Sequence, residues 1–175
     1  MTDVAAVTDR GRVREGNQDR YLTKNAAGVT LLAVADGVGG QAGGDVASAA
    51  AVEALASTFE FTARDAPTAL ASAMRAVNDA VLRATSESGH ATAASTLVAA
   101  TVRGRQLAVA NLGDSRAYLV RGATAMQITT DPAGELPNSI TRFVGDPRGV
   151  APDVFIEIVR PRDRVVLCSD GLTRH

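Results

Sequence analysis

The sequence predicts an α+β fold, in which helices cover antiparallel β-sheets. Short apolar runs bounded by glycine occur in both halves of the chain, and such runs are typical of buried strands. Two long segments with helical character, 45–58 and 67–86, lie between them. Because 175 residues is the size of one domain, we expect a single domain over 1–175.

The chain begins with predicted strands. Residues 3–8 are expected to form a short strand, and the polar residues 9–18 a loop. A hairpin around Asn25-Ala26-Ala27-Gly28 is predicted to join strands 19–24 and 29–35.

Two helices follow a glycine-rich loop at 37–44. Residues 45–58 are rich in alanine, which has the highest helix propensity. Pro67 suits the first turn of the second helix, 67–86. The apolar residues of this helix recur at helical spacing and predict one buried face: Leu70, Met74, Val77 and Val81.

The second half returns to short apolar runs. Four of them are predicted to form strands separated by loops and tight turns: 94–102, 106–112, 116–121 and 124–129. Residues 131–149 hold three of the six prolines and are expected to be mostly loop, with a short helix from Asn138 to Phe143. The last two strands are expected at 153–159 and 164–169.

The composition narrows the possible functions. Apolar residues make up 46% and aromatic residues only 3%, so Ala, Val and Leu must build the core. The net charge of −1 gives no basic footprint for nucleic acid or an anionic membrane. The sequence has neither an apolar stretch of membrane-spanning length nor the order of a signal peptide. We therefore expect a cytoplasmic protein.

The sequence gives little support for a nucleophilic cysteine or a zinc site. Cys168 is the single cysteine and is expected to be a buried core thiol. His90 and His175 are the only histidines, and neither has the spacing of a metal ligand.

Three apolar runs end in an aspartate beside a glycine. These aspartates are Asp36, Asp114 and Asp170, and Asp19 adds a fourth acid just before a strand. If the strand ends converge, the carboxylates make an all-oxygen site suited to Mg²⁺ or Mn²⁺.

Each of these aspartates has a simpler interpretation as a turn or helix-cap residue. The pattern Gly37-x-Gly39-x-x-Ala42 also fits a dinucleotide-binding loop, but the segment that follows is helix–helix rather than strand–helix–strand. Arg14, in a loop with two other arginines, is either a solvated charge or a phosphate-binding group.

Motifs along nearly the whole chain resemble those of one family. In order they are Thr8-Asp9-Arg10-Gly11, Asn17-Gln18-Asp19, Ala35-Asp36-Gly37-Val38-Gly39-Gly40, Ser95-Thr96-Leu97, Asn111-Leu112-Gly113-Asp114-Ser115-Arg116, Ser139-Ile140-Thr141-Arg142 and Ser169-Asp170-Gly171. The chain resembles the metal-dependent serine/threonine protein phosphatases of type 2C, in their bacterial form.

The resemblance implies a β-sandwich of two antiparallel sheets flanked by helix pairs, a four-layer α-β-β-α arrangement. It also implies that two Mn²⁺ or Mg²⁺ ions, with a possible third, activate a water that attacks phosphoserine or phosphothreonine. A phosphorylated protein would be the substrate, a serine/threonine kinase or its targets possible partners, and the phosphatase a monomer.

The resemblance also assigns roles to individual residues. Asp36 would bridge both ions, the Gly37 carbonyl would bind one, and Asp170 would complete the pair. Asp19 would order metal-bound water, Arg14 would hold the phosphate, and Asp114 would serve a third, weaker metal site.

The sequence departs from the family pattern at four places. No Asp-Asn motif follows Asp170, so we expect a domain truncated at its C-terminus. Only Pro132 to Asn138 stand where members have a longer flap, Val38 replaces a histidine, and Gln18 replaces a common glutamate. The alternative function is therefore a catalytically weak or inactive phosphatase-like domain that binds phosphoproteins or regulates a kinase pathway.

Overall fold

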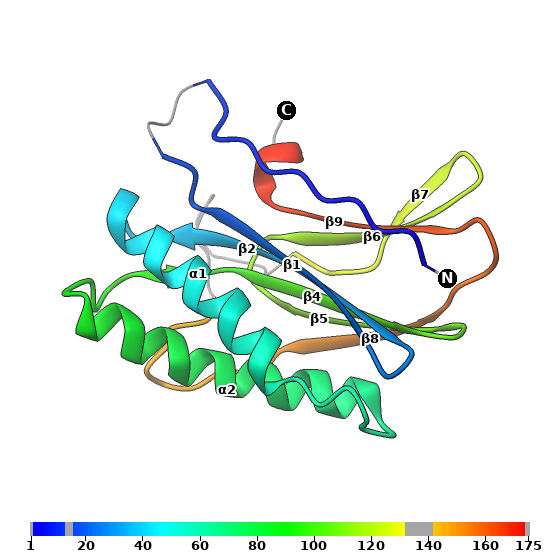
Figure 1. Cartoon of the computed structure of the whole chain (residues 1–175). Coiled ribbons are helices and arrows are strands. Elements are labelled where there is room, and N and C mark those ends of the chain that lie inside the picture. The colour runs from blue at the N-terminus through cyan, green and yellow to red at the C-terminus, as the bar shows by residue number, and fades with distance from the viewer. Residues whose placement is uncertain (1, 13–15, 132–141, 174–175) are drawn as a thin grey trace.

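The computed structural model describes residues 2–12, 16–131 and 142–173, which form two antiparallel sheets and two α-helices (Figure 1). The six-stranded sheet has the order β1-β2-β4-β5-β8, with β3 paired to β2, and the three-stranded sheet has the order β7-β6-β9. The elements are β1 (Asp19–Ala26), β2 (Val29–Val38), α1 (Gln41–Thr58), α2 (Ala66–Glu87), β3 (Ala94–Ser95), β4 (Leu97–Arg103), β5 (Gln106–Leu112), β6 (Arg116–Arg121), β7 (Thr124–Gln127), β8 (Asp153–Ile158), β9 (Arg164–Cys168) and a 3-10 turn, η1 (Asp170–Leu172).

Both helices pack on one face of the six-stranded sheet (Figure 1). Side chains alternate along β2, so that Leu31, Ala33 and Ala35 enter the core beneath the helices. The predicted apolar face of α2 is buried in this same core. The helical spacing of apolar residues in the sequence therefore identified the buried face of α2 correctly.

A second core lies between the two sheets. It is built from alternate residues of the central strands and of β6, chiefly Val98, Val109 and Leu119. The predicted sandwich of two antiparallel sheets is confirmed. In the part of the chain that the structure describes, the α-helices form one pair, which covers the six-stranded sheet, and neither is long and apolar enough to cross a membrane.

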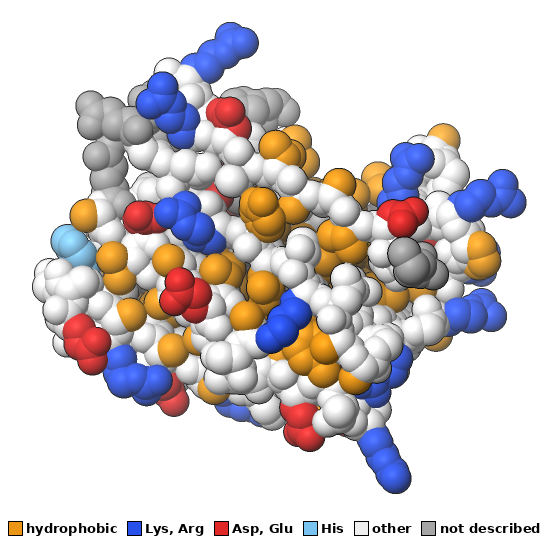
Figure 2. Space-filling model, viewed as in Figure 1, with side chains coloured by type: hydrophobic (Ala, Val, Ile, Leu, Met, Phe, Trp, Pro, Cys, Tyr) orange, Lys and Arg blue, Asp and Glu red, His pale blue; other side chains and the backbone are white. Residues whose placement is uncertain are grey.

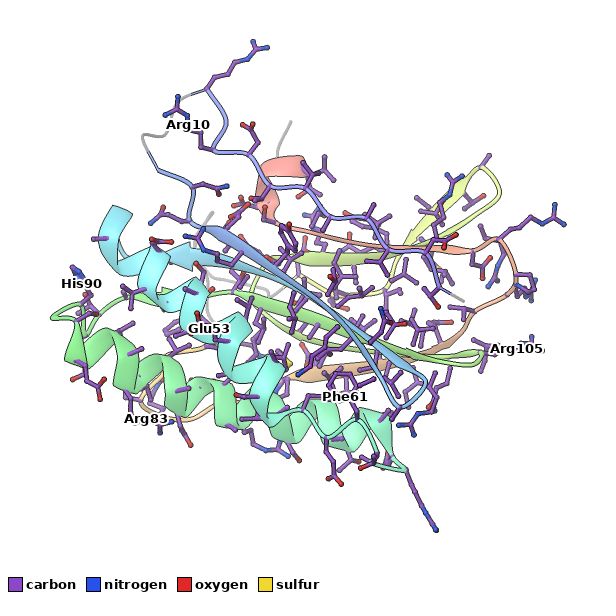
Figure 3. The ribbon with its side chains drawn as sticks, in the orientation of Figure 1. Arg10, Glu53, Phe61, Arg83, His90 and Arg105 are labelled. Atoms are coloured by element: carbon purple, nitrogen blue, oxygen red, sulfur yellow. The ribbon has the colours of Figure 1, made fainter. Side chains whose placement is uncertain are left out.

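Polar and aromatic contacts hold the α1–α2 connection against the sheet. Phe61 lies in this connection (Figure 3), and its ring packs edge-on against Phe59 with 5.0 Å between centroids. The ammonium of Lys24 lies 5.4 Å from the centroid of the Phe61 ring. Arg103 at the end of β4 donates to the carbonyl oxygens of Phe61 and Ala63, at 2.7 and 2.6 Å. The helix pair is therefore anchored at the end distant from β3.

Up to residue 102, three predictions of local structure were wrong. Residues 3–8 are exposed and form no strand, because within the described residues no strand pairs with them. The predicted loop at 37–44 is shorter, since β2 continues to Val38 and α1 already begins at Gln41. The predicted strand 94–102 is divided at Thr96 into β3 and β4.

In the second half, the boundaries shift less. The strands predicted at 124–129, 153–159 and 164–169 each end one or two residues earlier. Of the helix predicted from Asn138 to Phe143, residues 138–141 lie outside the described residues, and the last two residues are not helical.

The ion pair of Arg121 and Asp163 makes the stability of the fold depend on pH in the acidic range. Arg121 donates two hydrogen bonds to the Asp163 carboxylate, at 3.0 and 2.7 Å, and thereby lowers the pKa of Asp163 to about 2. Because this pKa lies below the unfolded value of about 4, the stabilisation is complete above about pH 4 and is lost as the pH falls toward 2.

We therefore expect Asp163→Asn to lower stability near neutral pH and to flatten its dependence on pH between about 4 and 2. Urea midpoints measured at several pH values test this, with Glu53→Gln on α1 as a control for loss of an exposed carboxylate. A variant with the acid dependence of the parent protein would contradict the assignment.

Candidate active site

Asp36 lies inside β2 rather than at its end, and only 9% of its surface is exposed. The antiparallel pairing of β1 and β2 places Asp19 directly opposite Asp36. Residues that face each other in this way project from the same side of a sheet, with Cβ atoms about 5 Å apart. The register of one hairpin therefore brings two of the predicted acids together.

Asp170 opens η1, which is separated from β9 by Ser169 alone. The preceding residue, Ser169, donates a hydrogen bond to Asp19 Oδ2 at 2.6 Å. This bond joins the end of the three-stranded sheet to the first strand of the six-stranded sheet. Asp19, Asp36 and Asp170 all line the same open groove, whose volume is about 2540 Å³.

The groove runs between the N-terminal segment, the β1–β2 hairpin and β9. Figure 2 shows hydrophobic side chains gathered along this hollow, with charged groups around it. The carboxylates therefore lie beside a largely apolar surface that is open to solvent.

Asp114 is placed differently. It lies in the turn between β5 and β6, is partly buried, and is not among the residues that line the groove. Nearby, Arg116 makes a two-pronged ion pair with Asp131, at 2.9 and 2.6 Å. Across the described ranges, no three His, Cys, Asp or Glu side chains form a group that could hold a metal ion. The structure thus brings Asp36 and Asp170 to one groove but leaves Asp114 outside it.

Gly37 occupies a position where a side chain does not fit. A Cβ at this residue would lie 2.0 Å from the carbonyl oxygen of Gly44 in the first turns of α1. The Gly37 amide donates to the Gln18 carbonyl oxygen at 3.1 Å, and Gln18 Nε2 donates to the Gly40 carbonyl oxygen at 2.7 Å. These contacts hold the turn after Asp36 against both β1 and α1.

The predicted phosphate ligand Arg14 lies outside the described residues. Two other arginines of the same segment, Arg10 and Arg12, line the groove. Arg10 projects from the N-terminal segment beyond the end of β1 (Figure 3). Positive charge from this segment therefore lines the groove.

Cys168 is buried, as predicted, and burial raises the pKa of its thiol. A thiol with a raised pKa is a poor nucleophile at neutral pH. His90 lies in the loop between α2 and β3 (Figure 3). A Cβ placed on Gly43 would lie 3.2 Å from the Cβ of His90. Cys168 lines the groove, whereas His90 does not.

Two polar residues beside the acids were missed as contributors to the site. Ser169 orients Asp19, and Gln18 binds the turn after Asp36. Each of these residues is the sequence neighbour of a predicted acid, and this position could have identified it as part of the site.

The donor groups suit a hard divalent cation. Asp19, Asp36 and Asp170 are among the aspartates that line the groove, and carboxylate and carbonyl oxygens are the ligands that Mg²⁺ and Mn²⁺ prefer. These donors match the chemistry of the metal that the motifs imply, although the described side chains do not gather into a group of three.

The close approach of Gly37 and Gly44 predicts that Gly37→Ala is severely destabilising. The new methyl group would push α1 away from β2, because the atom it meets belongs to the backbone. Thermal unfolding should show a marked loss of stability. Gly16→Ala is the control, since a Cβ there meets nothing within 4 Å. Equal stability of the two variants would show that the turn is looser than described.

The chain is similar to known proteins over nearly its whole length. The family model described as protein phosphatase 2C matches residues 9–175. The serine/threonine phosphatase stp of Listeria welshimeri is 36% identical over 191 residues, covering 95% of this chain and 76% of that protein. The chain thus spans about three quarters of that relative's length.

Solved structures show the same fold. The catalytic domain of the serine/threonine protein phosphatase PstP, in complex with two manganese ions, is 34% identical with a TM-score of 0.81, covering 97% of this chain and 77% of that one. Serine/threonine phosphatase Stp1 from Staphylococcus aureus is 30% identical with a TM-score of 0.84, covering 95% and 75%. This chain therefore belongs to the protein phosphatase 2C family.

Proposed function

We propose that this chain hydrolyses phosphoserine and phosphothreonine in proteins, in a reaction that depends on Mn²⁺ or Mg²⁺. The observation that carries the proposal is the placement of Asp19, Asp36 and Asp170 on one groove, in a chain that matches its family over residues 9–175. A solved relative in complex with two manganese ions supports the choice of metal.

The residues of the chain would divide the work between metal binding and phosphate binding. Asp36, the Gly37 carbonyl and Asp170 would hold two ions, Asp19 would order the water bound to them, and Asp114 would serve a third, weaker site. When bound, the ions supply Lewis acidity and lower the pKa of water. Arg14 would hold the phosphate, because a guanidinium binds two phosphate oxygens at once.

The position of Asp36 suits a residue that must keep its geometry. It is largely buried, and its backbone is bonded to neighbours on two strands. A carboxylate held in this way loses little freedom when it binds a cation, which favours binding. Asp19 is oriented in turn by the hydroxyl of Ser169.

The open groove suits a protein substrate. An extended segment carrying a phosphorylated side chain could lie along the apolar surface, with its phosphate near Asp19, Asp36 and Asp170. Proteins phosphorylated by a serine/threonine kinase are the partners that this chemistry implies.

The proposal predicts that Asp36→Asn abolishes metal-dependent turnover. Loss of a metal ligand should lower kcat by at least about 100-fold, since removing even a residue that only supports a ligand costs about 10–100-fold. The measurement is hydrolysis of an aryl phosphate and of a phosphothreonine peptide, each with millimolar Mn²⁺ and with EDTA.

Asp79→Asn is the matched control, because Asp79 is an exposed aspartate on α2. It should retain the parent rate. A parent protein without Mn²⁺-dependent turnover would overturn the enzyme proposal and leave a non-catalytic binding domain. Full activity of Asp36→Asn would overturn the metal assignment alone.

A further inference from the structure

Thr96 lies at the break between β3 and β4 and is completely buried, at 0% exposure. We propose that Thr96 is a positioning residue that fixes the backbones of the Asp36 and Asp114 segments relative to each other. The inference rests on the proposed metal-dependent function, and it assigns a role to the Ser95-Thr96-Leu97 motif.

Thr96 binds the backbone of Asp36 on both of its sides. The Thr96 amide donates to the Asp36 carbonyl oxygen at 2.9 Å, and the Asp36 amide donates to Thr96 Oγ1 at 3.1 Å. The hydroxyl of Ser95 also donates to the Asp36 carbonyl oxygen, at 3.0 Å. Together these bonds fix the peptide groups before and after the Asp36 Cα atom. The orientation of these two groups determines the direction in which the Asp36 side chain leaves the backbone.

Thr96 also contacts both residues that flank Asp114. Its Oγ1 lies 2.7 Å from the Ser115 hydroxyl oxygen, and Ser115 is only 1% exposed. Gly113 has a φ of +113°, and a Cβ there would lie 2.7 Å from Cβ and Cγ2 of Thr96. The turn that carries Asp114 therefore rests directly on the Thr96 side chain.

The hydroxyl group connects the two contacts. Thr96 Oγ1 accepts from the Asp36 amide and shares a second hydrogen bond with Ser115. Buried hydrogen bonds of this kind are costly to break, because water is excluded from the groups involved. If the hydroxyl is removed, the Asp36 amide loses its hydrogen-bond acceptor. Ser115 loses the hydrogen bond that connects its turn to Thr96.

These contacts join segments that are far apart in the chain. Asp36 belongs to β2 of the six-stranded sheet, whereas Ser115 precedes β6 of the three-stranded sheet. A change at Thr96 is thus expected to alter metal binding, although the Thr96 side chain is not among the groove-lining residues.

The experiment compares Thr96→Val with Thr96→Ser, which keeps the hydroxyl. Thr101→Val is the matched control, because Thr101 lies on β4 shortly after Thr96, is 1% exposed, and has a hydroxyl with no hydrogen-bond partner among the described residues. Mn²⁺ binding to EDTA-stripped protein is measured by titration calorimetry. Steady-state kcat and KM for an aryl phosphate, and the Tm in EDTA, are measured alongside.

We expect Thr96→Val to weaken Mn²⁺ binding by about tenfold or more and to lower kcat with little change in KM. Thr96→Ser should bind Mn²⁺ with an affinity within about twofold of the parent's. This difference is smaller than the loss of about tenfold or more that is expected when a supporting group is removed. Thr101→Val should bind Mn²⁺ as the parent does. This pattern would support a positioning role, since a purely structural residue would change Tm without changing the affinity of the folded protein.

Thr96→Val with the parent's Mn²⁺ affinity and a lowered Tm would overturn the inference while leaving the proposed function intact. A parent protein that neither binds Mn²⁺ nor turns over would overturn both. If Thr96→Val does not fold, Ser115→Ala replaces it, because it removes only the second contact. Unchanged Mn²⁺ affinity in Ser115→Ala would then overturn the inference, and weaker binding would support it.

Discussion

The peptide groups on either side of Asp36 bond to residues 95 and 96, which lie about 60 positions further along the chain. On the other side of β2, β1 pairs with the same residue and places Asp19 opposite it. Asp36 is therefore held between two neighbouring strands before any ligand is considered. Preorganisation of this kind reduces the entropy that a binding site must lose when its ligand arrives.

From Asp36, a continuous line of contacts reaches the other acidic segments. In one direction it passes through Asp19 to Ser169 and so to the turn that begins with Asp170. In the other direction it passes through Thr96 to Ser115, beside Asp114. Both directions cross from the six-stranded to the three-stranded sheet. The relative position of the two sheets thus determines how the carboxylates are spaced.

Local patterns in the sequence predicted the elements whose causes are local. The hairpin at Gly28 and the buried face of α2 follow from turn chemistry and helical spacing, and both are observed. The break at Thr96 could not be predicted, because its cause is a hydrogen bond to a distant aspartate. Likewise, the sequence places three aspartates after apolar runs, but only the sheet order decides that Asp114 lies outside the groove.

The alanine-rich core has a consequence for how this protein can change. Buried alanines on β2 and α1, among them Ala35 and Ala47, let the helix approach the sheet closely. The same approach brings Gly44 against Gly37. A larger side chain along this interface would push α1 away from β2 and would move the first turn of α1 relative to Asp36. Residues with no catalytic chemistry of their own would therefore be restricted in size by the packing around Asp36, and larger side chains should be tolerated best on the outer surfaces.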